Sequence, residues 1–187
     1  ILAAEALTEK LWNECFAAIL TSATLSALNS FDFLTMRTGL PEGSNFCRIG
    51  SPFNFAEAGV LRIPDKGFDA GDSSAHTQAI ISCLPDLLAD DKGALVLFSS
   101  RRQMQDVLEG LESNFRDKIL SQDDYPKQQL IALHKSNIDG GDRSIIFGLA
   151  SMSEGIDLPD AYCTHVVIAK LPFSVPDAPI DVTLGQW

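Results

Sequence analysis

The sequence predicts an α/β fold in which helices cover both faces of a parallel sheet. Three apolar stretches support such a sheet: ALVLF at 94–98, SIIFGL at 144–149 and HVVIAKL at 165–171. They run without regular alternation of apolar and polar residues, which is typical of parallel strands covered on both faces. Segments of about ten or more residues with helical spacing lie among the strands, and this alternation indicates crossover units.

The first part of the chain is predicted to contain two helices and two short strands. Leu7 and Leu11 repeat at helical spacing in the first helix, and Gly39 and Pro41 end the second. The stretches FAAIL and GVLRIP are apolar enough for strands, and Pro, Gly, Ser and Asn cluster between them. The predicted elements are a helix at 1–14, a strand at 16–20, a helix at 26–37, a loop at 41–54 and a strand at 59–64.

The second part of the chain alternates helices and strands more regularly. Met104, Val107 and Leu111 fall on one face of a predicted helix. Three prolines after Leu171 exclude regular structure there. The predicted elements are a loop at 66–74, a helix at 76–89, a strand at 94–98, a helix at 103–114, a strand at 118–120, a helix at 126–137, strands at 144–149 and 165–171, and an irregular segment at 172–181.

Composition narrows the class of protein. Hydrophobic residues make up 45% and charged residues 21% of 187 residues, the balance of a globular domain. No apolar run approaches the roughly 18 residues of a membrane span, so we expect no membrane association. The chain starts at Ile1 without a basic leader, and we interpret it as a piece of a longer cytoplasmic protein.

Charge and cysteine content bear on the partners. The formal net charge of −11 is unfavourable for binding nucleic acid, so any binding to DNA must use a few local cations or depend on other parts of the protein. The four cysteines are far apart and form no CxxC pair. We therefore expect no zinc or iron–sulfur site made by this segment alone.

Polar stretches follow three of the predicted strands. TSATL at 21–25 follows FAAIL, SSRRQM at 99–104 follows ALVLF, and SMSEGID at 151–157 follows SIIFGL. In parallel sheets, ligands bind beyond the carboxyl ends of the strands. The sequence therefore predicts that these three stretches meet at one edge of the sheet and form a site.

The stretch SSRRQM suits a phosphate group. Ser99 and Ser100 supply hydroxyls at a predicted helix start, where unpaired backbone N–H groups favour anions. Arg101 and Arg102 add two cations. The alternative is an N-cap serine followed by two solvated arginines, and the residues alone favour neither.

The other two stretches have different chemistry. Glu154 and Asp157 should repel a bare phosphate, and are better suited to orient a ribose hydroxyl, a water, a metal-bound water or an arginine from a facing domain. Gly155 allows close backbone approach. The alternative is an acidic loop at a helix start. In TSATL, small hydroxyl residues allow close approach of a ligand or domain, although a simple turn is favoured from the residues alone.

The order of these stretches resembles superfamily 2 DNA helicases of the XPD/DinG kind, in particular the bacterial DinG and YoaA helicases. TSATL, VLFSSRRQM, SEGIDLP and HVVIAKLPF occur in that order, and SPFN at 51–54 and LPFSVPDAPID at 171–181 strengthen the likeness. The resemblance covers nearly the whole chain. It implies a RecA-like second motor domain at 26–187, truncated before motif VI and preceded at 1–25 by the end of the first motor domain.

The resemblance also implies roles for individual residues. Thr21, Ser22, Ala23 and Thr24 match a motif that couples the nucleotide state to DNA. Ser99, Ser100, Arg101 and Arg102 match a segment that lies along single-stranded DNA. Ser153, Glu154, Gly155 and Asp157 match a nucleotide-sensing loop that also faces the DNA. Gln122 is a weaker candidate for a DNA contact.

Several family motifs are absent from these residues. The sequence contains no GxxxxGK[ST] phosphate loop and no Asp-Glu-x-His box, and the QxxGRxxR motif is expected after Trp187. The resemblance implies that ATP and Mg²⁺ bind to the full-length protein and that a 4Fe–4S cluster lies upstream. We expect the fragment alone to be inactive, as part of a helicase that moves 5′ to 3′ on single-stranded DNA in repair or replication.

A second hypothesis treats the chain as a non-catalytic docking module. The net charge of −11 fits an acidic docking face better than a DNA groove. The partner would be a replisome protein: a clamp-loader subunit, which the YoaA side of the resemblance implies, or a single-strand binding protein.

Overall fold

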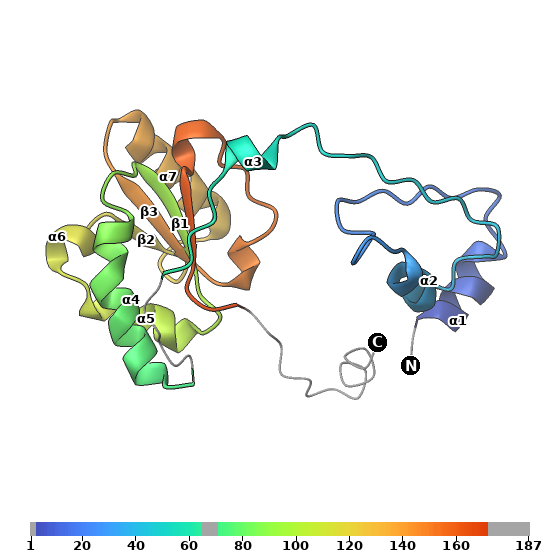
Figure 1. Cartoon of the computed structure of the whole chain (residues 1–187), viewed down its shortest axis with the longest axis horizontal. Coiled ribbons are helices and arrows are strands. Elements are labelled where there is room, and N and C mark those ends of the chain that lie inside the picture. The colour runs from blue at the N-terminus through green and yellow to red at the C-terminus, as the bar shows by residue number, and fades with distance from the viewer. Residues whose placement is uncertain (1–2, 65–70, 172–187) are drawn as a thin grey trace. The chain divides into compact units, whose positions relative to one another are not determined.

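The chain forms two compact units in this computed structural model, which describes residues 3–64 and 71–171 (Figure 1). Unit 1 comprises residues 1–63 with 175–187, and unit 2 comprises residues 64–174. The predicted irregular segment at 172–181 lies outside the described residues, as does most of the predicted loop at 66–74. The predicted domain boundary after residue 25 stays a prediction.

Unit 2 is built on a four-stranded sheet. Its strands are β1 (Gly93–Leu97), β2 (Ile119–Ser121), β3 (Ser144–Gly148) and β4 (His165–Ile168). All strand pairs are parallel, and the spatial order is β2-β3-β1-β4. The predicted α/β fold with a parallel sheet is confirmed.

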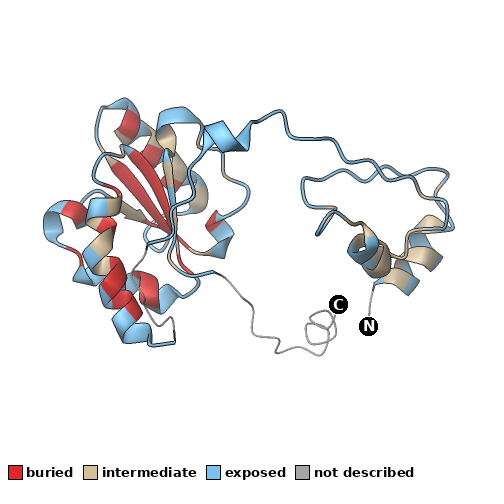
Figure 2. Cartoon of the chain, in the orientation of Figure 1, coloured by how far each residue is buried: buried red, intermediate tan, exposed pale blue. Residues whose placement is uncertain are grey.

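Helices cover the two faces of this sheet and bury different side chains. α4 (Ser73–Leu87), α5 (Arg101–Gly110) and α6 (Ser113–Arg116) pack on one face, and α7 (Lys127–Asp139) packs on the other (Figure 1). Figure 2 shows the buried residues concentrated in the central strands and the helix faces turned toward them. Alternate strand residues serve opposite faces: Val96 and Phe147 pack with Met104 of α5, whereas Leu95 and Ile146 pack with Leu130 of α7.

The strand β4 differs from its prediction. It ends at Ile168 rather than residue 171, and Val166 and Ile168 remain 52% and 54% exposed. β4 pairs only with β1 in the described sheet, and Val166 and Ile168 lie on the same face as Leu95, whereas Val167 packs against the cluster on the other face. The apolar run therefore did not imply burial on both faces.

A buried histidine, His134 of α7, contacts the start of β3 and the segment that precedes β4. Nε2 of His134 lies 2.6 Å from the carbonyl oxygen of Tyr162, and Nδ1 lies 2.9 Å from the Ser144 hydroxyl. A carbonyl can only accept, so Nε2 carries the proton and Nδ1 accepts from Ser144. Burial lowers the pKa of His134, which favours the neutral ring that this pairing requires.

Unit 1 is mainly short helices and irregular backbone. Its elements are α1 (Ala4–Leu7), the π-type turn η1 (Thr8–Trp12), α2 (Asp32–Thr38) and α3 (Phe55–Ala58). The indole N–H of Trp12 donates to the carbonyl oxygen of Thr38 at 2.7 Å and joins the two helical segments. Among residues 3–63, none is fully buried (Figure 2).

Two predicted strands of this unit are wrong. Residues 16–20 and 59–64 are irregular and exposed, with Phe16 at 107% and Ile19 at 93%. A strand needs a neighbour to pair its backbone groups, and the described residues of unit 1 supply none. The apolar composition of FAAIL and GVLRIP therefore gave the wrong secondary structure.

The second helix of unit 1 also begins later than predicted. Leu28 and Asn29 have positive φ angles of 48° and 68°, and a turn between Ala27 and Ser30 excludes helix there. The helix therefore begins at Asp32. It ends as predicted, because Gly39 has a φ of 63° and forms a left-handed cap.

Candidate nucleic-acid interface

The loop after β1 leads directly into α5. The Ser100 hydroxyl accepts from the backbone N–H of Gln103 at 3.3 Å, which is N-cap geometry. The helix therefore begins at Arg101, two residues before its predicted start. Arg101 and Arg102 lie in the first turn, with side chains 63% and 92% exposed. Two cations thus stand at a helix start at the carboxyl edge of the sheet.

Each of these arginines faces a carboxylate. Nε of Arg101 lies 3.6 Å from Oδ1 of Asp123, and Nε of Arg102 lies 3.9 Å from Oδ2 of Asp106. Exposed pairs of this kind contribute about 0–1 kcal/mol, so a phosphate can compete for either guanidinium. The sequence analysis did not identify Asp106 or Asp123 as partners.

Gln122 joins the loops after β2 and β3. Its Oε1 accepts from the backbone N–H of Leu149 at 2.8 Å and from the Ser151 hydroxyl at 3.3 Å. Its own backbone N–H donates to the carbonyl oxygen of Phe147 at 3.0 Å. Gln122 therefore orders the neighbouring loop, and its role as a DNA contact stays a prediction.

The loop after β3 begins with the 3₁₀ turn η2 (Ala150–Met152), after which the Ser153 hydroxyl donates to the carbonyl oxygen of Ala150 at 2.7 Å. Gly155 has a φ of 67°, a conformation that favours glycine. Glu154 and Asp157 are exposed. Their carboxylates are therefore accessible to groups outside this loop.

Lys127 holds this loop from the start of α7. Its ammonium donates to the carbonyl oxygens of Ser151 at 2.8 Å and of Glu154 at 2.7 Å. Lys127 was not among the site residues predicted from the sequence. Its only sequence signal is a cation immediately after Pro126, at a predicted helix start.

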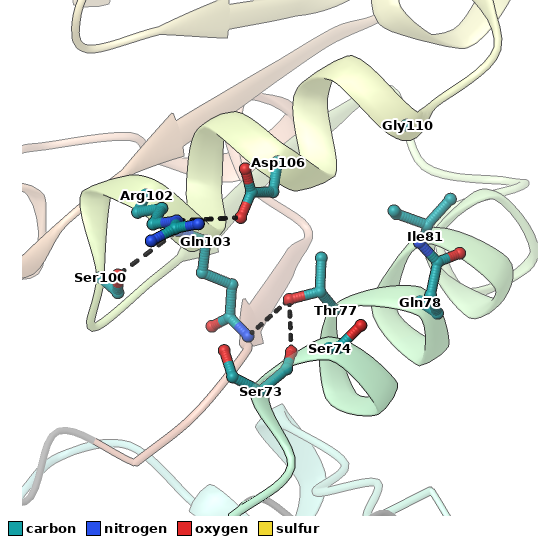
Figure 3. Close-up of a pocket in the computed structure, with 10 residues that line it drawn as sticks. All are labelled: Ser73, Ser74, Thr77, Gln78, Ile81, Ser100, Arg102, Gln103, Asp106 and Gly110. Atoms are coloured by element: carbon teal, nitrogen blue, oxygen red, sulfur yellow. Dashed lines mark hydrogen bonds and ion pairs between the residues drawn. The ribbon is translucent and has the colours of Figure 1, made fainter.

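A groove of about 490 Å³ lies between α4 and α5, beside Arg102 (Figure 3). The two helices approach closely at its far end, where a Cβ on Gly110 would lie 2.4 Å from Cδ1 of Ile81. At the other end, Asp72 caps α4 by accepting from the backbone N–H groups of Ser74 and Ala75 at 3.0 Å each. This carboxylate occupies the anion-binding N–H groups of α4.

A buried amide fixes the wall of this groove. Nε2 of Gln103 donates to the Thr77 hydroxyl at 3.3 Å (Figure 3). It also lies 3.1 Å from Nδ1 of His76. Gln103 is only 7% exposed, so the start of α5 is held firmly against α4. Arg102 is thereby carried on a fixed backbone at the edge of the groove.

The predicted coupling motif lies in unit 1. The hydroxyls of Ser22 and Thr24 are 3.2 Å apart, and the backbone N–H of Thr24 donates to the Ser22 hydroxyl at 3.3 Å. All four residues from Thr21 to Thr24 are exposed, and Ala23 and Thr24 lie in a turn. Their convergence with the loops of unit 2 stays a prediction.

Three loops of unit 2 thus form one surface, which we call the rim. It is defined by residues 99–102 after β1, 121–123 after β2 and 149–157 after β3. Asp123 and Gln122 connect the middle loop to the other two. The rim brings together these predicted site residues: Ser99, Ser100, Arg101, Arg102, Gln122, Ser153, Glu154, Gly155 and Asp157.

The comparison with known families decides the class of this fold. A family profile described as the helicase C-terminal domain matches residues 86–184, more than half of the 187 residues. This chain belongs to the helicase C-terminal domain family. The matched region includes all four strands and the whole rim, whereas Thr21–Thr24 lie before it.

Curated relatives extend the likeness over the full sequence, including the residues before the profile match. Proteins named ATP-dependent DNA helicase DinG from Salmonella typhimurium and Escherichia coli K12 are 37% and 35% identical over 193 residues, which is 100% of this chain. The protein of that name from Photobacterium profundum is 35% identical over 186 residues, or 97% of the chain. The chain spans about a quarter, 27%, of the length of each relative.

Within residues 3–64 and 71–171, no helix is long and apolar enough to span a bilayer.

Proposed function

We propose that this chain is part of an ATP-dependent DNA helicase and supplies most of its second motor domain, at residues 26–187. Residues 1–25 would end the first motor domain. The observation that carries the proposal is the rim, where loops from three parallel strands are joined and two exposed arginines stand at a helix start. The name shared by the curated relatives supports the same activity.

In the proposed cycle, ATP binds between the two motor domains, and closure of that cleft moves the second domain along single-stranded DNA. Arg101 and Arg102 bind backbone phosphates, with Ser99 and Ser100 as further donors. The loop at Glu154–Asp157 faces the nucleotide, where its carboxylates orient a water, a ribose hydroxyl or a facing arginine. The helicase would move 5′ to 3′ along single-stranded DNA and so unwind duplex DNA. It would do so in the cytoplasm, during DNA repair or replication.

The binding of ATP and Mg²⁺ would depend largely on residues outside this chain. The described residues contain no group of three or more His, Cys, Asp and Glu side chains that could hold a metal ion. A 4Fe–4S cluster needs four thiolates, which the described residues do not bring together, and no step of the cycle is assigned to the cluster or to Mg²⁺. We propose that a cluster, if the full-length protein has one, lies upstream.

A salt titration of DNA binding tests the proposed function. We expect this chain to bind single-stranded DNA with a Kd of about 10⁻⁴ to 10⁻⁶ M, weakening as salt rises, because a few phosphate contacts supply the affinity. We also expect no measurable ATP hydrolysis by the chain alone. Fluorescence anisotropy of a labelled oligonucleotide and a phosphate-release assay measure both. Sub-micromolar, salt-insensitive binding, or hydrolysis by the chain, would contradict the proposal.

The net charge of −11 favours a second candidate, a docking module for a replisome protein. Its partner would be a clamp-loader subunit or a single-strand binding protein. Pull-down of these purified proteins separates the two functions, because replacing Arg101 and Arg102 should weaken DNA binding about tenfold and leave docking intact.

A further inference from the structure

Lys127 stands at an electrostatically unfavourable position. It is the first residue of α7, no acidic residue lies in the first turn, and Pro126 provides no side-chain cap. The start of a helix carries partial positive charge, so a lysine there is disfavoured unless another group compensates for it. The side chain therefore needs acceptors outside its own helix.

The two acceptors of Lys127 enclose the start of the nucleotide-sensing loop. Its ammonium donates to the carbonyl oxygens of Ser151 and Glu154, at 2.8 and 2.7 Å. Hydrogen bonds from a charged donor are stronger than neutral ones. A Cβ on Gly155 would lie 3.6 Å from the same ammonium, so the loop follows the lysine closely as far as that glycine.

The beginning of this loop is held by Gln122, which lies in the connection between β2 and α7. Gln122 accepts from Leu149 and Ser151, and lies only five positions before Lys127. Asp123, next to Gln122, pairs with Arg101 and accepts from the side-chain amide of Gln105 at 3.0 Å. One short connection therefore contacts both the arginine-bearing helix α5 and the loop that carries Glu154.

We propose that Lys127 is a positioning residue that fixes the Ser151–Gly155 loop to the β2–α7 connection. Through that connection it links the loop facing the nucleotide to the helix facing the DNA. The link to catalysis rests on the proposed helicase function, whereas the fixing of the loop does not. Lys127 needs no contact with substrate for this role.

Hydrogen exchange on this chain tests the fixing of the loop. Removing two charge-assisted bonds in K127Q should speed exchange of the 151–155 amides about tenfold, because the loop then opens locally more often. K127R, which keeps a cation, should restore much of the protection. K92Q is the matched control, since Lys92 is exposed at the opposite edge of the sheet. Unchanged exchange in K127Q overturns the proposal.

Steady-state kinetics of a full-length protein carrying this segment tests the link to catalysis. K127Q should lower the kcat of DNA-stimulated ATP hydrolysis about tenfold, while the Kd for single-stranded DNA changes less than about threefold, since the phosphate-binding arginines remain. K127R should recover most of the kcat. An unchanged kcat, or a loss confined to DNA affinity, overturns the link. If the unsubstituted protein lacks DNA-stimulated hydrolysis, the proposed function fails, and the exchange result still decides the role of Lys127.

Discussion

Replacing Arg101 and Arg102 together by glutamine should weaken the binding of single-stranded DNA by this chain about tenfold. The slope of log affinity against log salt should fall in magnitude by about 1.4, because each lost phosphate contact on a single strand is worth about 0.7. The expected loss in affinity is moderate because, in the absence of DNA, each arginine already pairs with a carboxylate, Asp123 or Asp106. DNA binding must displace these pairs. Fluorescence anisotropy at several salt concentrations measures both quantities.

The matched control removes the same charge from the other edge of the sheet. Arg116 and Lys118 are exposed and lie just before β2, so R116Q/K118Q changes the net charge equally but leaves the rim intact. We expect this variant to retain at least about half of the affinity, since distant exposed charges are screened at physiological salt. Equal losses in the two double variants would mean that overall charge, rather than the rim, binds the DNA.

Gly148→Ala should destabilise unit 2 by about 1–3 kcal/mol, because it overpacks the end of a buried strand. The new Cβ would lie 2.6 Å from Cβ and Cγ of Met152, which is only 2% exposed and cannot easily move away. It would also lie 3.5 Å from Oε1 of Gln122. Urea unfolding followed by circular dichroism measures the stability change.

The same substitution should also weaken DNA binding, since Met152 and Gln122 belong to two loops of the rim. Gly140→Ala is the control: its Cβ would come no nearer than 3.4 Å to any atom, and its φ is an ordinary −69°. We expect the control to change stability by less than about 0.5 kcal/mol. If Gly148→Ala unfolds like the control, the packing described at this strand end is wrong.

The sheet of unit 2 could be predicted because its signals are local. The runs ALVLF and SIIFGL carry enough apolar surface to form central strands, and the helices between them show a clear apolar face. FAAIL has a similar composition and forms no strand. The difference lies in the neighbours that pair with a strand, and these are not encoded in the run itself.

The residues of the rim could be predicted, but most of their contacts could not. The topology of a parallel sheet brings the loops after β1, β2 and β3 to one edge, so spacing along the sequence was sufficient to place Arg101 and Glu154 there. The partners Asp123 and Lys127 come from a different connection, 22 and 27 positions away respectively from the residues they contact. No local pattern identifies such pairs, because they depend on side-chain directions in the folded chain.

The central claim is that the three loops of the rim bind single-stranded DNA together. Hydrogen exchange of this chain, with and without a saturating oligonucleotide, tests it most directly. The account predicts slower exchange at residues 99–102, 121–123 and 149–157 at once, and no change in α6 or in η3 (Asp160–Tyr162), which lie at the opposite edge of the sheet. Protection limited to a single loop, or found mainly in α6 and η3, would contradict it.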